Sequence, residues 1–376
     1  MDQIPVTVII PTYNRPELTL RAINSVHRQR PVPPAEIIVV DDGSHDNTAE
    51  LAGRSGVRII RHEHNRGLSA ARNTGISAAT HEWVALLDSD DEWLPHHLDE
   101  LWRLRADHVL VASSILHIGS DPRRDRVSGP LFRRQIVLRT PAPLIFPGNI
   151  VGPSAVMLRR RAVLEVGGFR SYSGVVEDLA LWLRMLEVGT GLISQKVGVL
   201  YHVHDEQMSG DHQRMFKGAS AAIDEHRDKT WCTPAVLERW RGRMAWDYLR
   251  LALRQGEHRR ALREVATLVG HHQRLIGLSA VLTRRFFERR RGSAVARNGL
   301  PSIALVPGAR PSCDELGDLT QGRSVRDLSS YGSFRRAYLH LVHRPTEAAI
   351  VRTTLQAALM RAAGVRPVRL VRRTKG

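Results

Sequence analysis

The sequence predicts an α/β fold in which helices cover both faces of a mostly parallel sheet, followed by a helical region. The first observation is that β-branched runs and helical segments alternate over residues 6–88. The second is that three of these runs end in polar residues, at Thr12, Asp42 and Asp88. The third is a change to helical spacing alone from Pro234 onward. The carboxyl ends of parallel strands meet at one edge of a sheet, where ligands bind, so we expect the functional site there.

The expected elements follow one another with short connections. Strands are expected at residues 6–10, 36–40, 57–61, 84–87, 108–112, 151–158 and 196–200. Helices are expected at residues 16–26, 46–54, 67–79, 98–104 and 159–166, and from residue 177. Most of the strands are continuous apolar runs, which is typical of strands buried on both faces. Residues 119–147 are rich in Pro, Gly and Arg, and we expect a loop-rich insert that folds over the site.

The chain is expected to contain three parts. A catalytic domain would span residues 1–230, and a helical hairpin with a basic helix would span residues 231–297. An irregular linker with a last helix and a basic tail would span residues 298–376. The apolar segment 275–282 leads into the arginine-rich segment 284–291, which fits a helix in a membrane interface or a core helix with a solvated basic end.

Composition excludes several classes of protein. The chain has 376 residues, 42% of them hydrophobic, which is enough for a large core. Its two cysteines lie far apart, so disulfide scaffolds and cysteine zinc sites are excluded. No apolar run is long enough to span a bilayer or to act as a signal sequence, and we expect a cytoplasmic protein.

The formal net charge of +17 indicates a polyanionic partner. An anionic membrane surface, nucleic acid and a phosphate-bearing substrate all fit this charge. Arginine is concentrated in the C-terminal part, so the protein is expected to bind peripherally at the inner face of the cell membrane through that part. Nucleic acid is disfavoured, because aromatic residues make up 5% of the chain and no RNA-binding motif is present.

The acidic stretch after the strand at residues 84–87 is the first candidate site. Asp88, Asp90 and Asp91 would lie at the carboxyl end of that strand. Clustered carboxylates raise one another's pKa unless a cation compensates them, and oxygen ligands favour Mg²⁺ or Mn²⁺. The alternative is a solvated acidic turn that caps the next helix. The sequence contains no GxGxxG and no GxxxxGK[ST] motif, so a dinucleotide site or an ATP phosphate loop is not supported.

Four segments follow one another along the chain: residues 11–15 (PTYNR), 39–44 (VVDDGS), 65–73 (NRGLSAARN) and 87–91 (LDSDD). In this order they resemble the successive motifs of family 2 glycosyltransferases, which have the Rossmann-like GT-A fold. The resemblance covers residues 5–210 and leaves the C-terminal part unassigned. Four motifs in order are far more specific than one acidic triplet.

The resemblance implies a nucleotide-sugar site. Tyr13 would lie against the base, and Asp42 would accept a hydrogen bond from the imide N–H of uracil or thymine. Arg72 would reach the base or the diphosphate, and Asp88 would lie near the ribose. The remaining residues of the expected nucleotide-sugar site are Pro11, Thr12, Arg15 and Ser89. The alternatives are a rim tyrosine, a turn-capping aspartate and an arginine paired at the surface.

The resemblance also implies the metal and the catalytic residues. Asp90 and Asp91 would hold Mn²⁺ or Mg²⁺, with His204 as a further metal or phosphate contact, unless His204 is an ordinary surface histidine. Glu177 and Asp178 begin a helix and match the catalytic motif, with Asp178 as the general base. The alternative is a pair of acidic residues that stabilises the first turn of a helix.

These inferences predict a metal-dependent, inverting hexosyl- or N-acetylhexosaminyl-type transferase. It would move a sugar from a nucleotide-diphosphate donor, a UDP-sugar above all, to a hydroxyl of a glycan, polysaccharide or lipid-linked acceptor. One rival is a non-catalytic scaffold that binds nucleotide sugars or polyanions. The other is a sugar-phosphate nucleotidyltransferase, which would need a glycine-rich loop after the first strand, where residues 11–16 provide none.

Overall fold

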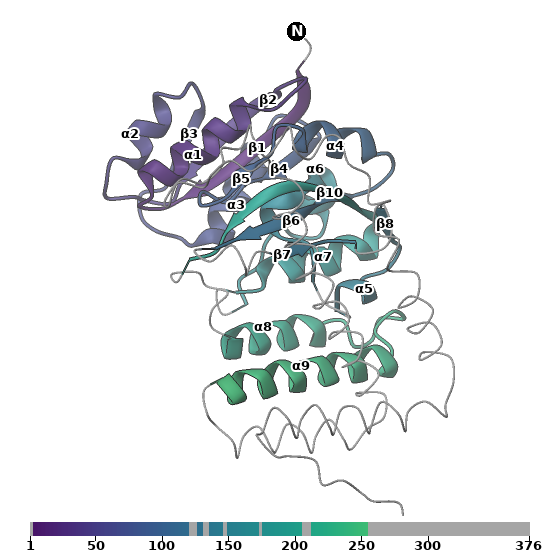
Figure 1. Ribbon diagram of the computed structural model, residues 1–376. Coiled ribbons are helices and arrows are strands. Elements are labelled where there is room, and N and C mark those ends of the chain that lie inside the picture. Colours follow the sequence, from purple (N-terminus) through teal and green to yellow (C-terminus); the bar gives the residue numbers. More distant parts are fainter. Residues whose placement is uncertain are drawn as a thin grey trace, which may run out of the picture. The chain divides into compact units, whose positions relative to one another are not determined.

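A ten-stranded sheet forms the centre of the computed structural model, which describes residues 3–119, 126–130, 135–145, 149–172, 175–204 and 212–254. The strands are β1 (Ile4–Thr12), β2 (Pro34–Asp41), β3 (Arg58–Arg61), β4 (Trp83–Leu86), β5 (Glu92–Trp93), β6 (Leu110–Ile118), β7 (Arg126–Ser128), β8 (Gln135–Leu138), β9 (Val156–Arg159) and β10 (Gly191–His202). Their order is β3-β2-β1-β4-β9-β6-β10-β5, with β7 beside β6 and β8 beside β10 (Figure 1).

The described sheet is mostly parallel. β1 pairs in parallel with β2 and β4, β2 with β3, and β6 with β10. β9 lies antiparallel between β4 and β6, so β6 and β10 point in the same direction as β1. Six strands, β1 to β4, β6 and β10, therefore run one way, while β5, β7, β8 and β9 run the other. This confirms the predicted fold class.

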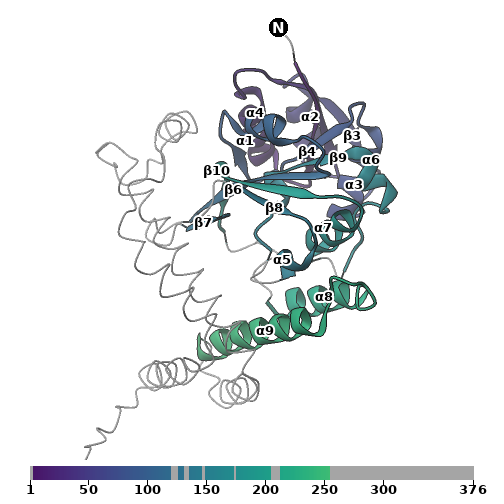
Figure 2. The same ribbon diagram turned by 90° about the vertical axis from the view of Figure 1, so that its right-hand side faces the viewer.

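Helices cover both faces of the sheet (Figures 1 and 2). They are α1 (Pro16–His27), α2 (Thr48–Gly53), α3 (Leu68–Ala78), α4 (His97–Leu104), α5 (Ala142–Ile145), α6 (Arg160–Glu165), α7 (Glu177–Val188), α8 (His212–Asp224) and α9 (Pro234–Arg254). Successive residues of β1 point to opposite faces. Ile10 belongs to a core cluster with α1, α2 and α4, whereas Ile9 belongs to one with α3, α6 and α7. α3 packs so closely on β1 that a side chain at Gly75 would collide with Ile9.

The structure differs from the predicted elements in several places, and β5, β7, β8 and α5 were not predicted. The strand predicted at residues 151–158 begins at Val156, because Pro153–Ala155 form a 3₁₀ helix. The strand predicted at residues 196–200 begins at Gly191 and pairs with β6 along its length. α8 was not predicted, although Met215, Ala219 and Ile223 recur at helical spacing and pack against the core cluster of α7.

The structure describes one helix of the helical region predicted for the C-terminal part. α9 spans Pro234–Arg254, and Trp240 packs into the core cluster that contains α7. The second helix of the hairpin, the arginine-rich segment 284–291, the linker, the last helix and the basic tail lie outside the described residues. The domain boundaries at residues 230 and 297 stay predictions. Within the described ranges, no helix combines the length and the apolar character that crossing a bilayer requires.

His97 at the start of α4 is a buried titratable group in the core. It is fully buried, and its ring lies against Trp93 with the centroids 4.5 Å apart. Neither ring nitrogen has a hydrogen-bond partner among the described residues. Burial, reinforced by the neighbouring His96, lowers the pKa of His97 from 6.5 to about 3. The folded protein therefore keeps this imidazole neutral.

We expect His97 to make stability depend on pH below 6.5. In that range the unfolded chain takes up a proton at His97, whereas the folded protein does not until about pH 3, so stability falls as the pH falls. Between pH 7.5 and pH 5.5 the loss from this group should be about 1.4 kcal/mol. Urea unfolding of wild type and His97→Leu at both pH values measures it. Equal pH dependence in the two proteins would contradict the assignment.

Candidate active site

The three polar strand ends converge at one edge of the sheet, as predicted. Thr12 lies opposite Asp41 in the parallel pair of β1 and β2, and the backbone N–H of Asp42 donates to the carbonyl of Thr12 at 2.9 Å. On the other side of β1, the N–H of Leu87 donates to the carbonyl of Ile9 at 3.1 Å. Asp88 therefore follows directly at the same edge. The short connections that follow these three neighbouring strands therefore lie together at this edge of the sheet.

The loop after β1 holds Tyr13 in an open position. Pro11 and Thr12 are the last residues of β1, and both are buried. The Oγ1 atoms of Thr12 and Thr19 lie 2.7 Å apart, which ties the end of β1 to α1. The backbone N–H of Arg15 donates to Thr48 Oγ1 at 3.0 Å, which ties the loop to α2. Tyr13 is 37% exposed, so its ring is accessible to a base, and stacking on a base stays a prediction.

Asp42 is buried and held by three donors. Its Oδ1 accepts from the N–H of Arg66 at 2.9 Å and lies 2.6 Å from Nδ1 of His62. Its Oδ2 accepts from the N–H of Gly67 at 2.8 Å. Asp42 thereby fixes the start of α3 relative to the end of β2. The imide contact predicted for Asp42 stays a prediction.

Gly43 allows the two loops around Asp42 to approach closely. Its φ is +80°, a left-handed conformation that glycine adopts without strain. A Cβ at this position would lie 2.7 Å from the backbone carbon of His64, and backbone cannot move aside as a flexible side chain can. The glycine of the VDDGS segment therefore sets the distance between the loop after β2 and the loop after β3.

Asp90 is the ionised carboxylate of the acidic turn. Its Oδ2 accepts from Arg15 at 2.6 Å and lies 3.2 Å from Nε2 of His204. Burial opposes ionisation, but Arg15 and His204 outweigh burial and hold the pKa of Asp90 below its ordinary value. The carbonyl of Asp90 also accepts from Arg21 of α1 at 2.7 Å. The loop after β1, the acidic turn and the end of β10 therefore meet at Asp90.

Asp91 faces the interior. It is 1% exposed, accepts from Ser154 Oγ at 2.6 Å and accepts from the N–H of His202 at 3.3 Å. Burial raises the pKa of Asp91 well above its ordinary value, and the nearby Asp90 and Asp88 raise it further. Ser89, also in this turn, is buried. Because both oxygens of Asp91 are engaged, its placement gives less support to metal binding than that of Asp90.

Arg72 joins the acidic turn to the start of α7. Its guanidinium donates to Asp88 at 2.7 Å and to Glu177 at 2.8 Å, and the residue is 1% exposed. The ring of Phe169 lies 5.2 Å from the guanidinium carbon. Burial raises the pKa of Asp88, and Arg72 offsets part of this effect. Arg72 is thus committed to two carboxylates, and its contact with a base or diphosphate stays a prediction.

The surroundings of Asp178 raise the pKa of its carboxyl group. It lies in the first turn of α7, where its Oδ1 accepts from the N–H of Leu179 at 2.6 Å. Its Oδ2 accepts from the amide of Asn149 at 3.2 Å. Burial, followed by the charge of Glu177, raises the pKa of Asp178 from 3.8 to about 7. A carboxylate with this pKa is suited to proton transfer near neutral pH.

The donor set fits a divalent cation that arrives with a diphosphate. No group of three or more His, Cys, Asp and Glu side chains is arranged to hold a metal ion anywhere in the described ranges. Asp90 and His204 supply one carboxylate and one imidazole at the same point of the edge. Mg²⁺ is commonly held by one or two carboxylates, with substrate phosphates and water as its other ligands. Two protein ligands therefore suffice for such a site.

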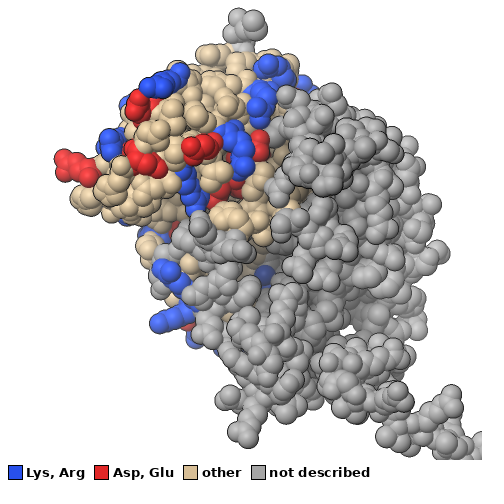
Figure 3. Space-filling view, turned by 60° about the vertical axis from the view of Figure 1, so that its left-hand side comes forward, with Lys and Arg blue, Asp and Glu red and all other residues tan. Residues whose placement is uncertain are grey.

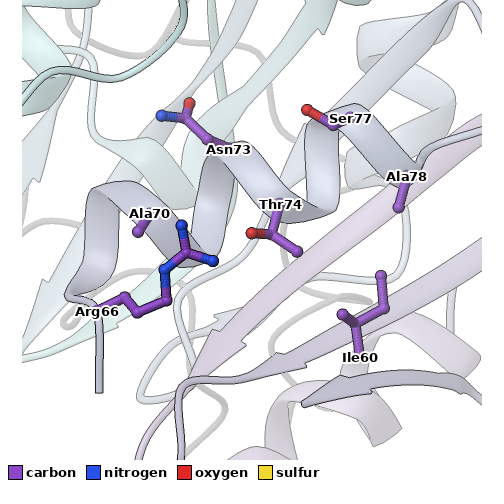
Figure 4. Close-up of a pocket in the computed structure, with 7 residues that line it drawn as sticks. All are labelled: Ile60, Arg66, Ala70, Asn73, Thr74, Ser77 and Ala78. Atoms are coloured by element: carbon purple, nitrogen blue, oxygen red, sulfur yellow. The ribbon is translucent and has the colours of Figure 1, made fainter. Parts of the chain in front are cut away.

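An open depression of about 640 Å³ lies along α3, beside the site (Figure 4). It is lined by Ile60, Arg66, Ala70, Asn73, Thr74, Ser77 and Ala78. None of these residues belongs to the predicted site. The depression has no assigned role.

Three residues of the site were not predicted from the sequence. His62 contacts Asp42, Asn149 contacts Asp178, and Ser154 contacts Asp91. A buried polar side chain in contact with a functional carboxylate has no local signature. Asn149 and Ser154 each contact a carboxylate that lies 29 or more positions away in the chain. Only the packed structure brings them together.

We expect Arg72→Met to destabilise the protein strongly. The substitution leaves Asp88 and Glu177 without their buried countercharge, which should cost about 3 kcal/mol of unfolding free energy. Arg54→Met is the matched control, because Arg54 pairs with Glu50 at the surface and its loss should change stability by less than about 0.5 kcal/mol. Chemical denaturation measures both. Equal midpoints for Arg72→Met and wild type would contradict the role of Arg72.

Known proteins that are similar to this chain agree with the family that the four motifs indicate. Residues 7–167 match the family described as glycosyl transferase family 2. The pre-mycofactocin glycosyltransferase of Mycobacterium tuberculosis is 30% identical over 279 residues, which cover 70% of this chain and 56% of that protein. The chain thus spans little more than half the length of this relative. A glucosyltransferase of Escherichia coli, named UDP-Glc:alpha-D-GlcNAc-diphosphoundecaprenol beta-1,3-glucosyltransferase WfgD, is 34% identical over 102 residues, 26% of this chain and 40% of that protein.

A solved structure shows the same fold. TarS of S. aureus, residues 1–349 in complex with UDP-GlcNAc, superposes with a TM-score of 0.54 over 78% of this chain and 92% of that one, at 16% identity. This likeness supports the GT-A architecture and extends beyond the four motifs. The matched residues 7–167 and the sequence relatives assign the N-terminal part of the chain to glycosyl transferase family 2.

Proposed function

We propose that the protein transfers a sugar from a nucleotide-diphosphate donor, a UDP-sugar, to a hydroxyl of a glycan, polysaccharide or lipid-linked acceptor. One observation carries the proposal. Arg72 joins Asp88, at the strand edge that would hold the nucleotide, to the start of α7, which carries the half-buried Asp178. The proposed donor site and the proposed proton acceptor would then lie next to each other.

The nucleotide side of the proposal rests on the loops at the strand edge. Tyr13 offers an exposed ring for a base, and Asp42 lies at the end of the neighbouring strand. A carboxylate accepts from the imide N–H of uracil or thymine, which favours UDP or dTDP over other nucleotides. The UDP-GlcNAc complex of TarS and the UDP-Glc in the name of WfgD support the choice of UDP.

Asp90 and His204 would hold Mn²⁺ or Mg²⁺, and the cation would neutralise charge on the departing diphosphate. Asp91 is left out of this ligand set, because its carboxylate is buried between Ser154 and the backbone of His202. Arg15 donates to Oδ2 of Asp90. It therefore adds a fixed positive charge beside the place proposed for the diphosphate.

The proton of the acceptor hydroxyl would pass to Asp178. The hydroxyl oxygen attacks the anomeric carbon, and the bond from that carbon to the diphosphate oxygen breaks. The neighbouring carboxylate, Glu177, is held by Arg72 and is therefore not free to act as a nucleophile. A single displacement with inversion of the anomeric centre is the course that this arrangement favours. Asn149 orients Asp178 by donating to its Oδ2.

Partners beyond the donor are proposed by class only. A lipid-linked acceptor is consistent with the diphosphoundecaprenol in the name of WfgD. The arginine-rich segment expected to bind an anionic membrane lies outside the described residues, so this partner stays a prediction, as does the inner face of the cell membrane as its location. On the face of the described residues shown in Figure 3, positive and negative side chains are interspersed, so this face does not support the polyanion-binding scaffold.

We expect activity to require the ionised form of Asp178. With a pKa of about 7, the carboxylate is protonated below that pH, so kcat/KM should fall tenfold for each pH unit below about 7 and level off above it. Asp178→Asn cannot accept the proton and should lower kcat by about 10³-fold. The measurement is transfer from radiolabelled UDP-sugars to purified acceptor at a series of pH values.

The control for this experiment is Asp224→Asn, because Asp224 lies at the end of α8 and pairs with Arg227 at the surface. It should leave the rate and the pH profile unchanged. Full activity of Asp178→Asn, with circular dichroism showing a folded protein, would exclude Asp178 as the base.

We expect Asp90 to determine the affinity for the cation. Asp90→Asn removes a full negative charge from the proposed ligand set and should weaken Mn²⁺ binding in the presence of UDP by about tenfold or more. Calorimetry and Mn²⁺ electron paramagnetic resonance measure this without catalysis. Glu50→Gln, an exposed carboxylate on α2, should bind Mn²⁺ as wild type does. Unchanged Mn²⁺ affinity in Asp90→Asn would refute the ligand role.

A further inference from the structure

His62 is a buried histidine that the proposed chemistry does not use. It follows β3 and is 7% exposed. Its Nδ1 lies 2.6 Å from Oδ1 of Asp42, and its Nε2 lies 2.9 Å from Oγ1 of Thr74. An ionised carboxylate only accepts hydrogen bonds, so Nδ1 of His62 carries the proton in this contact. The ring thus connects the proposed nucleotide site to the middle of α3.

Thr74 gives the ring a fixed support. It lies on α3, and in Figure 4 its side chain points toward β3, where Ile60 also lies. α3 is itself held against the sheet by the close approach of Gly75 to Ile9, and the bonds of Asn73 to the backbone of Phe169 join it to the connection between α6 and α7. Because both of its nitrogens are engaged, the imidazole of His62 cannot rotate without breaking a hydrogen bond.

The hydrogen bonds leave Asp42 little freedom. Each carboxylate oxygen accepts about two hydrogen bonds. His62 and the N–H of Arg66 fill Oδ1, and within the described ranges Oδ2 receives one hydrogen bond, from the N–H of Gly67. One acceptor position therefore remains, and it is on Oδ2. Asp42 is 4% exposed, so a ligand N–H would have to approach Oδ2 closely to use that position, and a ligand lone pair placed there would be repelled.

We propose that His62 is a positioning residue that fixes Asp42 so that one acceptor position selects a base with an imide N–H. This inference rests on the proposed use of a UDP- or dTDP-sugar. Uracil and thymine donate from N3, whereas cytosine presents a lone pair there. His62 touches neither the sugar nor Asp178, so it acts on base selection through Asp42 and not on the transfer step.

The experiment compares UDP and CDP binding to the full chain by calorimetry. Wild type should prefer UDP, and His62→Leu should reduce the ratio of the two affinities about tenfold, because Asp42 loses its side-chain donor and its fixed rotamer. His62→Asn should keep the ratio within about threefold of wild type, because its amide nitrogen can occupy the place of Nδ1. Thr74→Val should likewise have a small effect, since it leaves the Nδ1 contact in place.

The matched control is His226→Leu. His226 is another buried histidine that contacts a carboxylate, with its Nδ1 2.7 Å from Glu187, but it belongs to the region of α7 and α8. It should lower stability without changing the ratio of UDP to CDP affinity. The kcat of His62→Leu at saturating UDP-sugar should stay within about threefold of wild type, because the transfer step is untouched.

Three outcomes would overturn the inference. Unchanged affinities for both UDP and CDP in folded His62→Leu would show that His62 does not position Asp42 for the base. An equal loss of UDP and CDP affinity would show a general structural role. Absence of UDP and dTDP binding to wild type would instead refute the proposed donor, and the inference about His62 would fall with it.

Discussion

The buried guanidinium of Arg72 is the contact on which the rest of the site depends. It compensates Asp88 and Glu177, which come from the acidic turn and from the start of α7. A buried charge without a partner is far more costly than a buried pair, so the two carboxylates stay near each other for as long as Arg72 is between them. The position of the start of α7 relative to the strand edge at Asp88 is therefore held by two ion pairs.

The surroundings of each carboxylate separate the pKa values of residues that look alike in the sequence. Asp90 has its pKa lowered, because Arg15 and His204 outweigh its burial. Asp91 and Asp178 have theirs raised by burial and by neighbouring carboxylates. Cation binding requires an ionised carboxylate, and a proton acceptor works best with a pKa near the working pH, so this separation suits a division of roles.

The sequence predicts the sheet and the convergence of its ends because both follow from local patterns. Continuous apolar runs mark β1, β2 and β4, and parallel pairing brings Thr12, Asp42 and Asp88 to one edge whatever the exact register. The contact of Arg72 with Glu177 joins residues 105 positions apart, and nothing near either residue indicates it. The motifs could therefore not predict that Arg72 pairs with two carboxylates or that Asp91 lies in the interior.

Asp42 and Asp178 differ in how they are held. The donors to Asp42 come from within 25 positions along the chain, two of them from backbone N–H groups. Asp178 depends on Arg72 and Asn149, which belong to segments far from α7 in the sequence. Backbone groups are preserved when side chains change, whereas contacts between distant side chains are not. The surroundings of Asp42 should therefore tolerate sequence change that alters those of Asp178, which would let one fold keep the proposed donor while its acceptor varies.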